Sequence, residues 1–286
     1  MKLLVFGSTG QVATEMRRRL PQGTEADFLD RDAADLSDPA ACARIVAGCD
    51  ADAVVNVAAW TAVDGAEAEE DAATVVNGEA PAAMARACAA RDLPFIHVST
   101  DYVFDGRGET PFAPGDPTDP QNAYGRSKLA GETGIRASGA RFAILRTSWV
   151  VSAHGANFVK TMRRLGGERD ELRVVADQIG GPTPAAPIAD ALFAIARAMV
   201  GGQSGGTYHF AGAPDASWAD FARAIMEEAG LACRVEGIPS SDYPTPAARP
   251  LNSRLDCTSL AADFGIARPD WRAGLKDILD ETGADA

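Results

Sequence analysis

The chain has 286 residues, of which 46% are hydrophobic, and its 40 acidic and 27 basic side chains give a formal net charge of −13. This length and composition suit one large globular domain, or a nucleotide-binding domain joined to a smaller one. The acidic balance argues against a protein that holds nucleic acid by its phosphates, because such binding requires a basic surface.

The N-terminus and the cysteines predict a cytoplasmic protein that does not insert into a membrane. The first apolar run, Leu3–Phe6, is far too short for a signal peptide or a membrane span. The five cysteines form an odd set without a C-x-x-C pair. We therefore expect reduced thiols rather than a disulfide framework or a zinc site.

Short apolar runs alternate with helical stretches through the first half of the chain. One helix is expected from Pro39 to Ala47, because Asp38 can cap it and proline suits its first turn. Another is expected from Pro81 to about Arg91. This alternation is typical of an α/β fold with a doubly wound parallel sheet, whose strands are buried on both faces. The expected strands are Leu3–Phe6, Ala26–Leu29, Ala53–Val57, Phe95–Val98 and Phe142–Leu145.

After Trp149 the pattern becomes less regular. A helix is expected over Ile188–Val200, and a capping box at Ser217–Asp220 predicts the start of another. The stretch Tyr243–Asn252 contains too many prolines for regular structure, and a last helix is expected from about Trp271.

A glycine loop, Gly7-x-x-Gly10-x-x-Ala13, joins the first expected strand to a helix. Gly7 permits a tight turn, Gly10 lets the backbone approach a pyrophosphate, and the small Ala13 lets helix and strand pack closely. The N-terminus of the helix then offers N–H groups and a positive dipole to the phosphates. The loop predicts binding of NADH or NADPH, with a purely structural glycine turn as the alternative.

Asp30 follows the second strand about 20 residues after Gly10, where a carboxylate can bind the ribose hydroxyls of NADH. Arg31 comes next and can instead meet the 2′-phosphate of NADPH, so the choice between NADH and NADPH stays open. By the same logic Asp35 and Leu36 can border the adenine, or they can form a turn before the helix at Pro39.

These elements divide the chain into two predicted parts. Residues 1–150 are expected to form a Rossmann-like, NAD(P)-binding domain, which also receives residues of about 177–206. The rest of 151–286 is expected to form mainly a smaller, loop-rich, substrate-binding region.

Tyr124 and Lys128 lie four residues apart, which places a phenol and an ammonium group on one face of a helix. A free phenol has a pKa of about 10, and a nearby cation together with an oxidised nicotinamide stabilises its phenolate form. We therefore expect Tyr124 to give a proton to a substrate carbonyl oxygen while the cofactor gives hydride to the carbon.

Polar residues follow the third and fourth strands, at the edge where parallel α/β sheets bind ligands. Ser99–Asp101 offers a hydroxyl to the substrate carbonyl or forms a simple turn, and Asn56–Thr61 is expected to border the nicotinamide ribose. The three histidines have no metal-ligand spacing, so His97 and His209 are expected to be core residues.

Motifs spread over nearly the whole chain carry a family resemblance. They are Gly7-x-x-Gly10-Gln11-Val12, Asn56-Val-Ala-Ala-Trp-Thr-Ala-Val-Asp64, Ser99-Thr-Asp-Tyr-Val-Phe-Asp105, Tyr124-Gly-Arg-Ser-Lys128, Arg146-Thr-Ser-Trp149, Asp177-Gln-Ile-Gly-Gly-Pro-Thr183 and Tyr243-Pro-Thr-Pro-Ala-Ala-Arg249. On these motifs the chain resembles the extended short-chain dehydrogenase/reductases and, more narrowly, the dTDP-4-dehydrorhamnose reductase family.

The resemblance implies NAD(P)H-dependent reduction of the C4 keto group of dTDP-4-dehydro-β-L-rhamnose to dTDP-L-rhamnose. It implies Thr100, Tyr124 and Lys128 as the catalytic set. Trp149 would pack on the sugar and Arg249 would bind the diphosphate, although a core tryptophan and a structural arginine are the alternatives. The implied substrate contacts are Thr100, Asp101, Trp149 and Arg249. Together with the loop residues above, the cofactor set is Gly7, Gly10, Gln11, Val12, Asp30, Asp35, Leu36, Ala59, Trp60, Thr61, Tyr124 and Lys128.

The chain also departs from the family pattern. The family commonly has histidine where Trp60 stands and glycine where Ala13 stands. Some members dimerise through a magnesium ion held by glutamates, and Glu15 matches one of these. Because Pro184–Pro187 has no acid where another is expected, we predict no metal site and leave monomer or homodimer open.

Two other functions fit parts of the pattern. One is another sugar-nucleotide epimerase or dehydratase of the same superfamily, although dehydratases usually have a glutamate where Tyr102 follows Asp101. The other is a non-catalytic, cofactor-binding regulatory subunit, which loss of Tyr124 or Lys128 would indicate. Both residues are present.

Overall fold

A parallel six-stranded sheet forms the centre of the computed structural model, which describes residues 1–284. The strand order is β10-β5-β4-β3-β1-β2, so the chain leaves β1 on one side to form β2 and returns to the other side to form β3. This reversal opens a crevice at the carboxyl ends of β1 and β3. The Rossmann-like α/β fold predicted from the sequence is thereby confirmed. The strands are β1 (Lys2–Phe6), β2 (Glu25–Leu29), β3 (Ala53–Asn56), β4 (Phe95–Thr100), β5 (Phe142–Thr147) and β10 (Thr207–His209).

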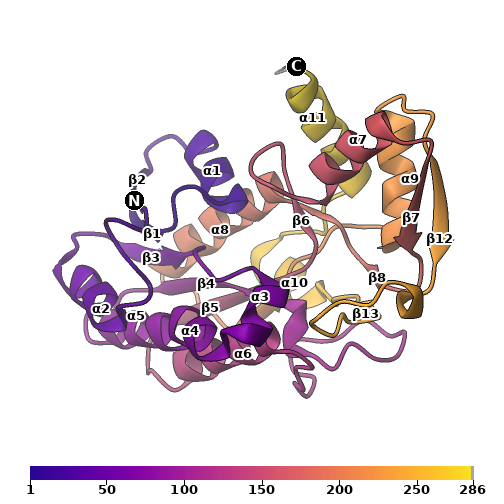
Figure 1. Cartoon of the computed structure of the whole chain (residues 1–286). Coiled ribbons are helices and arrows are strands. Elements are labelled where there is room, and N and C mark those ends of the chain that lie inside the picture. Colours follow the sequence, from indigo (N-terminus) through magenta and orange to yellow (C-terminus); the bar gives the residue numbers. More distant parts are fainter. Residues whose placement is uncertain (285–286) are drawn as a thin grey trace.

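Helices cover both faces of this sheet (Figure 1). Three of them pack side by side on one face, and two others pack together on the opposite face. The first group is α2 (Pro39–Gly48), α5 (Ala80–Ala89) and α6 (Ala123–Arg136), and the second is α1 (Gln11–Arg18) and α8 (Ala185–Val200). Shorter segments at the carboxyl edge are α3 (Val63–Ala68), α4 (Glu70–Thr74), η1 (Val75–Glu79) and η2 (Asp101–Val103).

The pleat of β1 explains why helices must cover both faces of the sheet. Leu3 and Val5 are fully buried in the core shared with α1 and α8, whereas Leu4 and Phe6 are buried in the core shared with α2, α5 and α6. Successive side chains of a strand point to opposite faces, so an uninterrupted apolar run requires a helix layer on each side.

Helix caps fix where several of these helices begin. The Asp38 side chain accepts a hydrogen bond from the Ala41 N–H at 2.9 Å, with Pro39 in the first turn, as predicted. The Ser217–Asp220 capping box is also present and opens α9 (Trp218–Glu228). Each cap satisfies N–H groups that the helix itself leaves without partners.

The second half of the chain is more regular than the predicted loop-rich region. Two parallel strands and three helices enclose a separate apolar core around Phe221 and Trp271. The ribbons of these elements lie in the right half of Figure 1. These elements are β7 (Glu171–Val175), β12 (Arg234–Ile238), α7 (Phe158–Glu168), α9 and α11 (Trp271–Ala284). Five short strands form two further small sheets, with the orders β11-β8-β13 and β6-β9. They are β6 (Val150–Val151), β8 (Ile179–Gly180), β9 (Thr183–Pro184), β11 (Ala216–Ser217) and β13 (Asn252–Ser253). The remaining elements are η3 (Ser240–Asp242) and α10 (Thr258–Phe264).

The second half also returns to the main sheet, because α8 packs against α1 and β10 pairs with β5. None of the helices of residues 1–284 has the length and apolar character that crossing a bilayer requires. All five cysteines are free thiols.

Candidate active site

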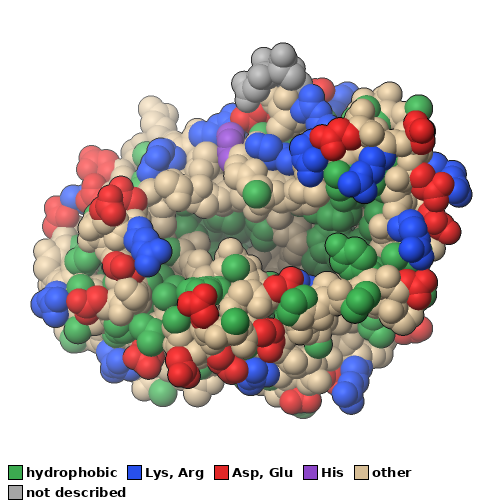
Figure 2. Space-filling view, viewed as in Figure 1, with side chains coloured by type: hydrophobic (Ala, Val, Ile, Leu, Met, Phe, Trp, Pro, Cys, Tyr) green, Lys and Arg blue, Asp and Glu red, His purple; other side chains and the backbone are tan. Residues whose placement is uncertain are grey.

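A cavity of about 760 Å³ lies at the crevice between β1 and β3. Gly7 lies at its base with a φ of +114°, and a side chain there would meet Val57 and Ala58 at 3.1 and 3.2 Å. Only glycine combines this backbone conformation with this close approach. Figure 2 shows the face of the molecule hollowed across its middle, with apolar side chains along the hollow.

The glycine loop presents the N-terminus of α1 to this cavity. Gly10 is the N-cap residue, and no side chain of the described residues caps the helix there. A β-carbon at Gly10 would have no neighbour within 4 Å in residues 1–284. The first N–H groups of α1 are therefore available to an anionic group such as a pyrophosphate.

Most of the predicted cofactor residues line this cavity. Gln11 and Val12 do not: the Gln11 side chain bonds Ser152 and Asn157, and Val12 packs on the core between sheet and α1. Tyr124 and Lys128 also lie outside the lining set. Those that line it are Gly7, Gly10, Asp30, Asp35, Leu36, Ala59, Trp60 and Thr61.

Asp30 and Arg31 lie together at the end of β2, where the sequence predicts the adenosine ribose. Oδ1 of Asp30 accepts a hydrogen bond of 2.9 Å from the Ala33 N–H, which leaves its second oxygen for a ribose hydroxyl. Arg31 is exposed and pairs with Asp35 at 3.5 Å. Both a carboxylate and a guanidinium are thus within reach of this end of the cavity.

The loop after β3 is fixed by Asn77 on η1, a residue that the sequence analysis did not single out. Its side-chain oxygen accepts from the Trp60 N–H at 2.8 Å, and its nitrogen donates to the Trp60 carbonyl and to the Ser127 hydroxyl, both at 3.0 Å. Asn77 therefore connects the loop that borders the cavity to α6, which carries Tyr124 and Lys128.

Tyr124 lies in the first turn of α6. The Asn122 side chain caps this helix by accepting from the Gly125 N–H at 2.8 Å. The Tyr124 ring meets the edge of Tyr102, with ring centroids 5.5 Å apart. Burial raises the pKa of Tyr124 to about 12, and the Thr100 hydroxyl opposes this shift only in part. At neutral pH Tyr124 therefore holds its proton.

Lys128 lies one helical turn later and is almost fully buried. Its Nζ donates to the Val98 carbonyl at 2.8 Å and lies 3.2 Å from Nε2 of His97. Burial lowers the pKa of Lys128 to about 8, and the charge of Glu132 opposes this shift. The spacing of Tyr124 and Lys128 on one helix agrees with the sequence, whereas the contact with His97 was not foreseen.

Within the Ser99–Asp101 segment, one side chain is bonded in the core and the other two lie at the candidate site. Ser99 donates to Glu132, which forms a buried ion pair with Arg146, so Ser99 belongs to the core. The Thr100 hydroxyl donates to Oδ1 of Asp101 at 3.1 Å and accepts from the Tyr102 N–H. Asp101 is buried, and this raises its pKa to about 6.

Trp149, a predicted substrate contact, has a φ of +49°, a conformation that few bulky residues adopt. Its indole stacks on Trp218 with ring centroids 3.6 Å apart and planes 12° from parallel. A β-carbon at Gly180 would come within 2.9 Å of the same indole, so a larger residue does not fit there without displacing the ring. The stack occupies one face of Trp149. Trp218 was not predicted as part of the site.

Arg249, the predicted diphosphate ligand, forms an ion pair of 2.7 Å with Asp64 on α3. Its Nη1 is buried and has no hydrogen-bond partner among residues 1–284. The side chain borders a smaller hollow of about 220 Å³, together with Tyr102 and Asn122. Asp64 therefore holds Arg249 in place and leaves part of its guanidinium for an anion.

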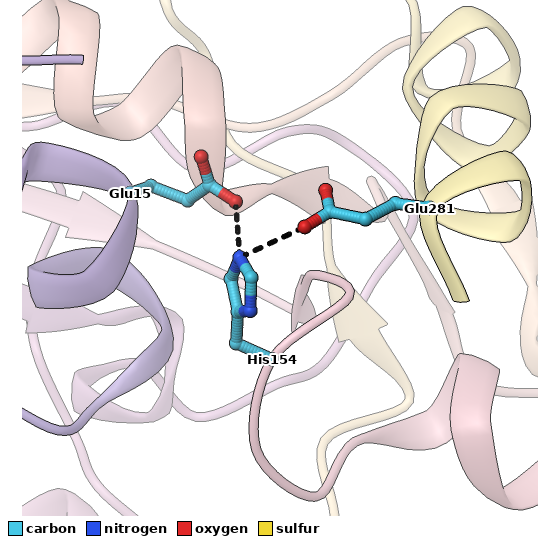
Figure 3. A group of neighbouring side chains, drawn as sticks. All are labelled: Glu15, His154 and Glu281. Carbon is cyan, nitrogen blue, oxygen red and sulfur yellow. Dashed lines mark ion pairs between the residues drawn. The ribbon is translucent and has the colours of Figure 1, made fainter. Parts of the chain in front are cut away.

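Glu15 on α1 meets His154 and Glu281, from the loop after β6 and from α11 (Figure 3). Nε2 of His154 lies 3.2 Å from a Glu15 oxygen and 3.5 Å from a Glu281 oxygen. Arg18 forms ion pairs with both glutamates. Its guanidinium compensates part of their charge. That this chain has no metal site stays a prediction.

The chain is similar to known proteins over nearly its whole length. The family described as "RmlD substrate binding domain" matches residues 1–283. A protein of Burkholderia thailandensis named dTDP-4-dehydrorhamnose reductase is 47% identical, over 98% of this chain and 100% of that protein. The chain belongs to the dTDP-4-dehydrorhamnose reductase family. The expected resemblance is thus confirmed over nearly the full length.

Solved structures of the family have the same fold. A dTDP-4-dehydrorhamnose reductase of Clostridium acetobutylicum superposes with a TM-score of 0.93 at 33% identity, covering 99% of this chain and 100% of that one. The enzyme of Bacillus anthracis, solved in complex with NADP, gives a TM-score of 0.91 at 31% identity, covering 98% and 99%.

Proposed function

We propose that this protein reduces the C4 keto group of dTDP-4-dehydro-β-L-rhamnose to dTDP-L-rhamnose, with NADH or NADPH as the reductant. The observation that carries the proposal is the arrangement at the carboxyl edge of the sheet: the glycine-loop cavity is lined by Trp60, which packs on the same apolar cluster as the half-buried Tyr124 of α6. Full-length similarity to named dTDP-4-dehydrorhamnose reductases, and the NADP complex of one of them, support the same activity.

Residues that line the cavity, among them Gly7, Asp30 and Trp60, would hold the cofactor, and its nicotinamide would supply the hydride for C4 of the sugar. Tyr124 gives its phenolic proton to the oxygen on C4 as that oxygen gains negative charge. Its pKa of about 12 suits this direction of reaction, because the phenol must still carry a proton when the substrate arrives. The Thr100 hydroxyl lies beside it and orients the carbonyl, and the charge on Lys128 stabilises the phenolate that remains.

The substrate is held, in this proposal, by groups from the second half of the chain and from η2. Trp149 offers one face of its indole to the sugar, since Trp218 covers the other. Arg249, fixed by Asp64, binds the diphosphate through its remaining N–H groups. Asp101 lies next to Thr100 and contacts a sugar hydroxyl.

The reductase differs from an epimerase or dehydratase of the same superfamily in its use of the cofactor. A reductase releases oxidised cofactor at each turnover, whereas the others regenerate it within the cycle. Addition of the keto sugar should therefore oxidise NADH or NADPH in amounts equal to the sugar consumed, measured by the loss of absorbance of the reduced nicotinamide.

Tyr124→Phe tests the mechanism directly. The variant keeps the ring and should still bind NAD(P)H, but its turnover should fall by about 10²–10⁴-fold, because the proton donor is lost. Tyr208→Phe is the matched control, because it removes a hydroxyl that bonds Asp263 outside the proposed site. Wild-type turnover in Tyr124→Phe would contradict the proposal.

We also propose a cytoplasmic monomer or homodimer with a small-molecule substrate and no nucleic-acid partner. The net charge of −13 and the reduced thiols support these assignments. Sedimentation of the purified protein measures which of the two assemblies forms.

A further inference from the structure

A chain of polar groups runs through the sheet behind Lys128. The Ala58 N–H donates to Oδ1 of Asn56 at 3.1 Å, and Nδ2 of Asn56 lies 3.1 Å from Nδ1 of His97. Nε2 of His97 in turn lies 3.2 Å from Nζ of Lys128. Asn56 and His97 are fully buried and lie opposite each other on the paired strands β3 and β4.

The backbone fixes the direction of the first two hydrogen bonds. A backbone N–H can only donate, so the atom of Asn56 that faces Ala58 is the side-chain oxygen. The side-chain nitrogen of Asn56 then faces His97, and this nitrogen can only donate as well. Nδ1 of His97 therefore accepts a hydrogen bond and carries no proton.

The neutral state of His97 fixes the third hydrogen bond. Burial is the main cause that holds the pKa of His97 well below its usual value, so the imidazole carries one proton. With Nδ1 as the acceptor, that proton is on Nε2 and points at Nζ of Lys128. A neutral amine can accept this hydrogen bond through its lone pair. An ammonium group has no lone pair, so its N–H would face the Nε2–H of His97 and the two donors would repel each other.

The surroundings of Lys128 agree with this direction. The amine can still donate to the Val98 carbonyl while it accepts from His97. Among the titratable groups around it, His97 comes from β4, whereas Glu132 and Tyr124 come from α6 itself. Only the charge of Glu132 favours the ammonium form, and Glu132 is already paired with Arg146.

We propose that Asn56 and His97 are positioning residues of the reductase, whose hydrogen-bond directions favour the uncharged amine of Lys128. Lys128 is then a group that takes up and loses its proton near neutral pH, and not a permanent cation. This inference depends on the proposed function for its effect on turnover, but the direction of the hydrogen bonds is a property of the resting protein.

The first test measures the tautomer of His97 by ¹⁵N NMR of protein labelled at histidine. The chain has three histidines, so His154→Gln and His209→Gln assign the spectra. We expect the wild type to carry its proton on Nε2. Asn56→Asp replaces the donor by an acceptor of the same size, and should move the proton to Nδ1. A wild-type His97 protonated on Nδ1 would overturn the proposal.

The second test is the pH dependence of single-turnover reduction. Wild-type rates should fall above about pH 8 as Lys128 loses its charge. Asn56→Asp turns His97 into an acceptor for Lys128, and His97→Gln offers a carbonyl oxygen to it. Both should extend activity to higher pH, by about tenfold in rate one pH unit above the wild-type midpoint. His97→Gln separates this effect from the added charge of Asn56→Asp.

His209→Gln is the matched control, because His209 is also a buried neutral histidine but contacts Phe112 and Arg146. Its pH profile should match the wild type. Unchanged pH profiles in folded Asn56→Asp and His97→Gln would overturn the proposal. Full activity of Tyr124→Phe would instead contradict the proposed function and leave the tautomer measurement intact.

Discussion

The Thr100 hydroxyl donates a 3.1 Å hydrogen bond to Oδ1 of Asp101, whose other oxygen has no partner within the described chain, residues 1–284. A carboxylate buried in this way opposes folding, because it loses its hydration without full compensation. The same oxygen is available to a substrate hydroxyl. Asp101 therefore belongs to the groups that favour binding at the expense of stability.

Asp101→Asn should stabilise the protein at neutral pH. A carboxyl whose pKa rises from 3.8 to about 6 destabilises the folded state by up to about 3 kcal/mol above pH 6. Well below pH 3.8 the group is protonated in both states, so the gain from this substitution should fade as pH falls through 6 and be largely lost by pH 4. Urea unfolding at several pH values measures this, with the exposed Asp71→Asn as control. An equal gain at pH 4 and pH 7 would refute the assignment.

Asp30→Ala should shift the preference between the two cofactors. Without the carboxylate, the ribose hydroxyls of NADH lose a hydrogen-bond acceptor, which weakens NADH binding. The 2′-phosphate of NADPH loses a repulsive negative charge beside it, which strengthens NADPH binding. We expect kcat/KM for NADH to fall about tenfold relative to that for NADPH, a change of about 1.4 kcal/mol. Arg31→Ala is the opposing control and should disfavour NADPH. Equal effects on both cofactors would show that Asp30 does not contact the ribose.

The sequence alone predicted the sheet and the glycine loop because their causes are local. An apolar run such as Leu3–Phe6 must be buried on both faces, and Gly7 and Gly10 follow it directly. The strand β10 was not predicted, since so short a strand carries no periodicity. Its place beside β5 depends on residues that come much earlier in the chain.

The parts of the site that escaped prediction are contacts between distant residues. Asn77 bonds the backbone of Trp60, and Trp218 stacks on Trp149, yet neither pair is close in sequence. His97 was expected to be an ordinary core residue. It is buried as expected, but its contact with Lys128 exists only because β4 and α6 pack together.

Trp218→Ala should weaken substrate binding and leave the cofactor unaffected. The Trp149 indole would lose the ring on which it stacks, and aromatic pairs of this kind contribute about 0.5–1.5 kcal/mol. We therefore expect KM for the keto sugar to rise by up to about tenfold, while KM for NADH stays unchanged. Trp218→Phe keeps an aromatic partner and should restore most of the loss. Equal changes in both KM values would point to a general loss of structure.

Removal of metal ions should leave the wild type unaffected. Arg18 compensates Glu15 and Glu281, so treatment with a chelator should change neither turnover nor Tm. Arg18→Met leaves two carboxylates and His154 within reach of one ion, and a divalent metal should then raise Tm by a few degrees. Arg17→Met, on the same helix but stacked on Phe28, should show no metal response. A drop in the wild-type Tm on chelation would mean that this cluster holds a metal after all.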